Sequence, residues 1–314
     1  MATDAILGIS SSAELADGAK HPRGARVYSA LADYWALTKP EINFLIAIAT
    51  FAGFCLDRPT GFREFPLLLL IHTLLGTLLV ASGTGTLNQY IERRFDAQMR
   101  RTARRPLAAG RMRPSKAFWF GIALSVAGAV YLAVAANFLA SGLAIATLVS
   151  YLFLYTPLKR KTPFCTLVGA VPGAMPPLIG AAAARGELPL EAWVLYLILF
   201  LWQFPHFMAI AWMYREDYDR AGYFVLPHGE PRARFVNLQT ILPLVALVAV
   251  SLVPTLRGRL DVFYCVGALL LSLGFFYYGA QLVLRRSNMA ARRLLVASVV
   301  YLPALMVLIL LGRI

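Results

Sequence analysis

Apolar segments long enough to cross a lipid bilayer recur along most of this chain. A helix needs about 20 apolar residues to span the hydrocarbon core, and it satisfies its own backbone hydrogen bonds there. Hydrophobic residues make up 59% of the sequence and charged residues only 15%. The sequence therefore predicts an all-α, polytopic membrane protein, in which about nine transmembrane helices bundle around a central cavity open to the inner face. The predicted spans lie near residues 41–56, 66–87, 117–136, 138–156, 165–183, 191–213, 236–254, 261–284 and 293–311.

Positively charged residues fall mainly in alternate loops between these spans. With the N-terminus placed inside, 24 of the 30 Lys and Arg residues lie on the inner side. Short loops rich in Lys and Arg stay in the cytoplasm, so the asymmetry predicts a multi-pass protein of the cell inner membrane with a cytoplasmic N-terminus. The net charge of +14 follows from this topology and suits contact with anionic lipid. We therefore expect the lipid bilayer as a partner and no binding of nucleic acid.

The first 38 residues differ from the rest of the chain because they are polar and include several acidic side chains, such as Asp4 and Asp33. These acids distinguish the segment from a signal peptide or a transit peptide. We expect residues 1–38 to form a loosely ordered tail and residues 39–314 to form the transmembrane domain. The acidic tail also favours a bacterial inner membrane over import into an organelle.

Three side chains with oxygen atoms follow the second predicted span at regular spacing. Asn88, Glu92 and Asp96 are four residues apart, so a continuous helix presents them on one side. Two carboxylates at this spacing repel each other, and Mg²⁺ would remove that repulsion while also binding substrate phosphate oxygens. We therefore predict Asn88, Glu92 and Asp96 as metal ligands and catalytic residues of a diphosphate site. The alternative is an ordinary solvated helix end beyond a membrane span.

Cationic residues follow this trio and recur after the fourth predicted span. Arg101, Thr102 and Arg105 lie in one short segment, and guanidinium and hydroxyl groups are good donors to phosphate oxygens. Lys159 and Arg160 repeat the pattern in a second inner loop. We predict that these five side chains bind the diphosphate, while anchoring at the membrane surface accounts for some of the arginines.

The sixth predicted span is unusual because it carries strongly polar residues within an apolar helix. Pro205 should kink this span, and His206 follows it directly. His206 and Asp217 are 11 residues apart, so they face one direction if the helix continues. Ionisable groups inside a membrane indicate function by default, although His206 could instead be a satisfied packing residue.

These motifs resemble the signature of a known family of membrane enzymes. The sequence matches Asn-x-x-x-Glu-x-x-x-Asp-x-x-Met-x-Arg-Thr-x-x-Arg-Pro-Leu between Asn88 and Leu107. This pattern is similar to that of the UbiA-type intramembrane prenyltransferases, and the resemblance spans roughly residues 40–310. Further segments resemble the heme-directed branch of that family: YTPLKRKT at 155–162, GAMPPLIG at 173–180, WQFPHF at 202–207 and DYDRAG at 217–222.

The resemblance implies transfer of a farnesyl group from farnesyl diphosphate to a vinyl group of protoheme IX, with addition of water, to give heme O and diphosphate. Mg²⁺ on the predicted ligands would stabilise the departing diphosphate. Quinone-directed relatives mostly carry a second acidic motif in the sixth helix, where this sequence has His206, Met213 and Asp217. The resemblance therefore implies heme contact by His206 and a catalytic role for Asp217.

Two other functions fit parts of the sequence. An aromatic prenyltransferase that acts on a quinone precursor would share the diphosphate site and differ in its acceptor. A multi-span transporter could also hold ionisable residues at the midplane, but it would need no metal-dependent release of diphosphate. A heme-modifying enzyme is expected to work beside a downstream heme A synthase or the machinery that assembles a terminal oxidase.

Overall fold

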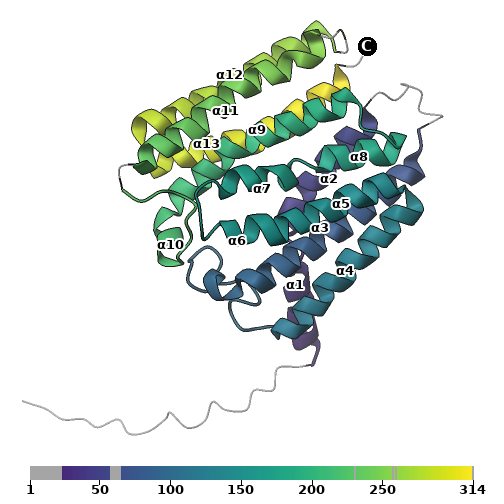
Figure 1. The fold of residues 1–314 in the computed structure, drawn as a ribbon, viewed down its shortest axis with the longest axis vertical. Helices are drawn as coiled ribbons and strands as arrows, with labels where there is room; N and C mark the ends of the chain where they lie inside the picture. The colour runs from purple at the N-terminus through teal and green to yellow at the C-terminus, as the bar shows by residue number, and fades with distance from the viewer. Residues whose placement is uncertain (1–22, 57–64, 230, 257, 259, 313–314) are drawn as a thin grey trace, which may run out of the picture.

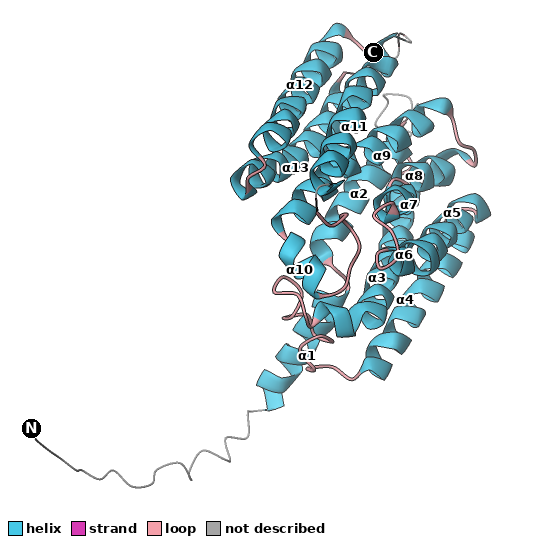
Figure 2. Cartoon of the chain, turned by 60° about the vertical axis from the view of Figure 1, so that its left-hand side comes forward, coloured by secondary structure: helices cyan, strands magenta, loops and turns pink. Residues whose placement is uncertain are grey.

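The computed structural model describes residues 23–56, 65–229, 231–256, 258 and 260–312, and every regular element in these ranges is a helix (Figures 1 and 2). Eight segments there are long and apolar enough to cross a membrane, and the 16-residue apolar helix α2 (Pro40–Cys55) is shorter. The predicted spans thus correspond to eight candidates together with α2. The eight are α3 (Leu67–Asp96), α4 (Pro114–Ala135), Phe138–Leu158, Cys165–Arg185, α9 (Leu190–Met213), α11 (Pro231–Leu256), α12 (Val262–Arg285) and α13 (Asn288–Leu311).

The helices form two groups that meet along α9. α11, α12 and α13 pack together and against α9, and they share one apolar core with it. α2, α3, α4, α5 (Phe138–Val149) and α8 (Pro176–Arg185) form the second group, with a core of their own. In Figure 1 the first group lies in the upper part of the view and the second below it. Polar residues of the candidate site lie at one end of this bundle.

The fifth predicted span is divided into α7 (Cys165–Gly173) and α8 by a break before two consecutive prolines. Proline lacks an amide hydrogen, so neither Pro176 nor Pro177 can donate a backbone hydrogen bond to the preceding turn, which explains the break. α8 then packs tightly on α2. The contact is so close that a Cβ at Gly53 would collide with the Pro177 carbonyl, and one at Gly180 would collide with the Thr50 carbonyl. Small residues allow backbones in a membrane to approach this closely.

Residues 23–37 form helix α1 (Arg23–Leu37), where the sequence predicts a loose tail; residues 1–22 of that tail lie outside the described residues. Leu37 is fully buried and packs with Leu107 of the loop that follows α3. Tyr34 contacts the ring of Phe120 edge to face. The side chain of Gln89 donates hydrogen bonds to the carbonyls of residues 36 and 37. These contacts with residues far along the chain hold the end of α1, and the local sequence could not indicate them.

Candidate active site

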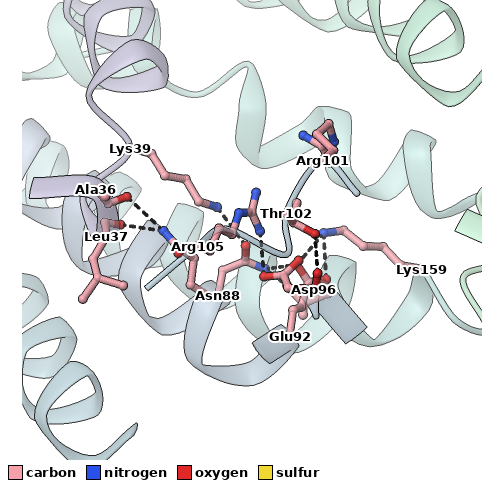
Figure 3. A network of polar contacts seen from close by, with 12 residues as sticks. Ala36, Leu37, Lys39, Asn88, Glu92, Asp96, Arg101, Thr102, Arg105 and Lys159 are labelled. Atoms are coloured by element: carbon pink, nitrogen blue, oxygen red, sulfur yellow. Dashed lines mark hydrogen bonds and ion pairs between the residues drawn. The ribbon is translucent and has the colours of Figure 1, made fainter. Parts of the chain in front are cut away.

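The three predicted oxygen ligands occupy successive turns at the end of α3. Asn88, Glu92 and Asp96 are all buried, with 1%, 5% and 1% of their surfaces exposed. The Asn88 side-chain amide donates a hydrogen bond of 3.0 Å to Glu92 Oε2, so the residues share one face as the spacing predicts. Figure 3 shows this face and the cationic side chains that approach it. Buried carboxylates require compensating charge, and the surrounding elements supply it.

Three cations from three different segments pair with these ligands. Lys159 Nζ lies 2.9 Å from Glu92 Oε1 and 3.2 Å from Oε2. Arg105 donates to Asp96 Oδ2 over 2.7 Å. Burial opposes the charge on Lys159, but the Glu92 carboxylate outweighs it and raises the pKa of Lys159 well above its usual value. Lys159 therefore stays cationic, and the trio lies in a mainly positive pocket.

The third cation is Lys39, which the sequence analysis missed. Its Nζ donates a hydrogen bond of 2.9 Å to Asn88 Oδ1. Lys39 connects α1 to α2 in the left-handed region, at φ 55° and ψ 63°, a conformation that costs a non-glycine residue about 1 kcal/mol or more. Burial and repulsion from Arg105 lower the pKa of Lys39 to about 7. The one signal in the sequence is a lysine immediately before Pro40, where the first apolar segment begins.

A π-helical turn shapes the wall opposite α3. The fourth span continues from α5 through the π-helix Ser150–Tyr155 into α6 (Thr156–Leu158). Thr156 accepts a hydrogen bond of 3.2 Å from the Asn88 amide and donates one to the carbonyl of Tyr151. Lys159 Nζ lies 4.5 Å from the centre of the Tyr155 ring. π-Helical turns occur frequently at functional sites, and this one brings Thr156 and Lys159 to the trio.

The loop after α3 carries the predicted arginines and is fixed by hydrogen bonds. Thr102 is buried, and its hydroxyl donates to the Asp96 carbonyl over 2.8 Å, so it shapes the loop. Arg101 lies 5.6 Å from the centre of the Tyr214 ring, and Arg160 lies 4.3 Å from that of Phe95. Of the five residues predicted to bind diphosphate, Arg105 and Lys159 contact the trio through their side chains, while Arg101 and Arg160 lie over aromatic rings.

Asp217 and His206 are not presented on one helix, because α9 ends at Met213 and α10 (Arg215–Arg220) begins after Tyr214. Asp217 accepts a hydrogen bond of 3.0 Å from the Arg100 backbone amide and pairs with Arg220 at 3.2 Å. It therefore connects α10 to the arginine loop. The shared direction that a continuous helix would give these two residues therefore does not apply.

His206 faces α13 instead. Its Nδ1 is 2.8 Å from Ser298 Oγ, and its ring stacks on Trp202 at 4.7 Å between centres. The Trp202 indole donates to the Ser298 carbonyl over 2.8 Å. Pro205 lies within α9, which remains helical on both sides of it. These contacts fix the orientation of the imidazole and engage its Nδ1.

Tyr223 is a second residue that the sequence analysis missed. It lies in the segment after α10, is 3% exposed, and packs edge to face against Phe95 and Tyr218. Burial and the nearby charge of Glu92 raise the pKa of its hydroxyl. Tyr223 therefore stays protonated and can donate a hydrogen bond to an anion in the pocket. A tyrosine in a polar loop gives no signal of this in the sequence.

One carboxylate oxygen of the trio is left for a divalent cation that is shared with a phosphate ligand. Asp96 Oδ1 is buried without a hydrogen-bond partner, and an anionic oxygen in that state favours a cation. Within the described part of the chain, no three His, Cys, Asp or Glu side chains gather into a metal cage. Mg²⁺ is commonly held by one or two carboxylates and completed by phosphate oxygens, which this donor set allows.

Comparison with known proteins identifies the family. The UbiA prenyltransferase family matches residues 46–303. The chain is 51% identical to a protoheme IX farnesyltransferase of Solibacter usitatus (strain Ellin6076), over 90% of this chain and 98% of that protein. It is 46% identical to a protoheme IX farnesyltransferase of Salinibacter ruber (strain DSM 13855 / M31), over 88% and 97%.

Solved structures share the fold. A digeranylgeranylglyceryl phosphate synthase superposes with a TM-score of 0.71 at 18% identity, over 90% of this chain and 98% of that one. A UbiA homolog from Archaeoglobus fulgidus, bound to GPP and Mg²⁺, superposes with a TM-score of 0.60 at 16% identity, over 88% and 99%. The chain is an all-helical membrane protein that belongs to the UbiA prenyltransferase family.

Proposed function

We propose that this protein transfers a farnesyl group from farnesyl diphosphate to a vinyl group of protoheme IX, with addition of water, to give heme O and diphosphate. The observation that carries the donor half is the convergence of Lys39, Arg105 and Lys159 on the buried trio. The acceptor half is supported by the names of relatives that are 51% and 46% identical over nearly their whole length.

The difficult step is cleavage of the allylic carbon–oxygen bond, which leaves its electron pair on the diphosphate. Asn88, Glu92 and Asp96 would hold Mg²⁺, which supplies positive charge to the diphosphate when bound. Lys159 and Arg105 add positive charge where negative charge grows, so they stabilise the transition state more than the ground state. Tyr223 adds a neutral donor.

The allylic carbon then forms a bond with the terminal carbon of the vinyl group, and the neighbouring carbon becomes cationic. Water adds its oxygen there and loses a proton, which completes the hydroxyethylfarnesyl side chain. The apolar interior of the bundle keeps water from the first cation. We assign His206 to the acceptor side because Ser298 and Trp202 orient its ring and leave Nε2 for heme.

We propose that Asp217 acts by positioning the arginine loop after α3. Its hydrogen bond with the Arg100 amide fixes the segment that carries Arg101 and Arg105. We also propose that the site end of the bundle faces the cytoplasm from the cell inner membrane, since 24 of the 30 Lys and Arg residues fall on that side. Work beside a heme A synthase or terminal oxidase assembly remains a prediction.

The test is mass spectrometry of heme extracted after the purified protein is incubated with protoheme, farnesyl diphosphate and Mg²⁺. We expect a product heavier by one farnesyl group and one hydroxyl group, and no such product with EDTA. Product formation in EDTA would refute the metal dependence. Transfer to a phenolic acceptor but not to protoheme would instead support the aromatic prenyltransferase, and failure to release diphosphate with either acceptor would refute the enzyme.

A further inference from the structure

A groove of about 500 Å³ lies between α12 and α13, and none of its lining residues belongs to the candidate active site. Its walls are apolar and face outwards: Leu270, Val296 and Val300 are 66%, 57% and 58% exposed. On helices that cross a bilayer, such side chains face the acyl chains. The volume lies in the range of sites that hold small molecules.

One end of the groove is cationic. Arg292 and Arg293 line it near the start of α13, Arg285 ends α12, and Arg286 lies in the short turn that follows. Within the described part of the chain, none of these four arginines forms an ion pair with a carboxylate. Arg215 of α10 donates to the Asn288 side chain over 2.8 Å, which places this turn at the same end of the bundle as the active site.

We propose that this groove binds one anionic phospholipid from the leaflet at the site end of the bundle. Its phosphate lies against Arg292 and Arg293, and an acyl chain follows the apolar walls. From Arg293 to Tyr301 the groove extends over 8 helical residues, or about 12 Å at 1.5 Å per residue. One leaflet contributes about 15 Å to the hydrocarbon core, so the chain of one lipid is long enough to cover this length.

Charge complementarity selects an anionic lipid over a zwitterionic one. Two guanidinium groups without acidic partners favour a headgroup with net negative charge, and basic pockets between helices at the inner surface suit such lipids. A free phosphate would leave the apolar walls uncovered. The acyl chain therefore covers the apolar walls that form most of the groove, and the headgroup pairs with the arginines at its end.

Gly274 offers a way to fill the groove without disturbing the bundle. It lines the groove, and a Cβ built on it meets no atom within 4 Å. Gly274→Leu should therefore occupy the space of the acyl chain. Gly142 of α5 is a matched control, because a Cβ there also meets no atom within 4 Å and the position lies outside the groove.

The experiment is native mass spectrometry of the delipidated full-length protein, titrated with phosphatidylglycerol or with phosphatidylcholine of the same acyl chains. We expect one tightly held phosphatidylglycerol per chain and weaker phosphatidylcholine. Arg292→Gln with Arg293→Gln should weaken phosphatidylglycerol binding about 30-fold, at about 1 kcal/mol for each arginine. Gly274→Leu should abolish the tight site, and Gly142→Leu should retain it. The exposed pair Arg113→Gln with Lys116→Gln, which removes the same charge at another helix start, should also retain it.

Equal retention of the two lipids, or equal losses in the groove and control variants, would overturn the proposal. Displacement of the lipid by inorganic diphosphate alone would identify the arginines as a free phosphate site. Displacement by protoheme would identify the groove as an acceptor site. Either displacement would overturn the lipid assignment, and neither depends on whether farnesyl transfer occurs.

Discussion

Replacing Lys159 by Met should destabilise the protein, because it breaks a buried ion pair, and should slow the reaction, because it removes a cation from the diphosphate site. The side chains of Lys159 and Glu92 are 14% and 7% exposed, and their charged atoms are 2.9 Å apart. Removing one partner of a buried pair leaves the other charge uncompensated, which typically lowers the free energy of unfolding by about 3–5 kcal/mol. Lys39 offers partial compensation to Glu92, so we expect about 3 kcal/mol.

A double variant separates the two effects. Glu92→Gln combined with Lys159→Met removes both charges, so the free energy of unfolding should return to within about 1 kcal/mol of the wild type. The reaction should not recover, because both a metal ligand and a cation for the diphosphate are lost. Loss of one donor to a developing anion typically lowers kcat about 100-fold, which we expect for Lys159→Met alone.

The measurements are urea titrations in detergent micelles and the rate of diphosphate release. Lys161→Met is the control, because Lys161 is an exposed cation nearby and its loss should change stability by less than about 0.5 kcal/mol. If the loss of unfolding free energy in the double variant equals the sum of the losses in Lys159→Met and Glu92→Gln alone, the interaction between the two residues is not the source of the stability. Wild-type release of diphosphate by Lys159→Met would refute its role in the reaction.

Three further predictions follow from the same site. Asp96→Asn should keep the hydrogen bond with Arg105 but lower turnover about 100-fold and raise the Mg²⁺ concentration for half-maximal rate; an unchanged metal requirement would contradict the ligand assignment. The pKa of Lys39 is about 7, so Lys39 is mostly neutral at pH 8, and binding of an anionic diphosphate should raise this pKa and make the protein take up a proton. Calorimetry of diphosphate binding in buffers of different ionisation enthalpy would detect the proton uptake, and Lys39→Met should abolish it. His206→Ala should weaken protoheme binding, measured by absorbance titration, and leave farnesyl diphosphate binding intact; the opposite pattern would contradict its assignment to the acceptor.

Local periodicity was sufficient to predict the membrane-spanning segments and the shared face of the trio. Asn88, Glu92 and Asp96 are on one continuous helix, so their relative positions depend on helix geometry alone. Lys39 and Tyr223 come from segments more than 100 residues apart, and they reach the same helix only through tertiary packing, Lys39 at Asn88 and Tyr223 at Phe95. Local periodicity does not indicate the helix end at Tyr214 either, nor the contact of Asp217 with the Arg100 amide, which joins segments 117 residues apart.

The contact of α2 with α8 determines where a site residue lies although it contains no reactive group. Gly53 is 14 residues along α2 from Lys39, or about 21 Å at the rise of a helix. Backbone meets backbone at Gly53, so even a methyl group there must push α2 away from α8. α2 would then tilt as a rigid body, and this tilt would move the Lys39 ammonium relative to Asn88. A substitution at Gly53, near the end of α2 that lies away from the site, would thus behave in assays as though the diphosphate site itself had been altered.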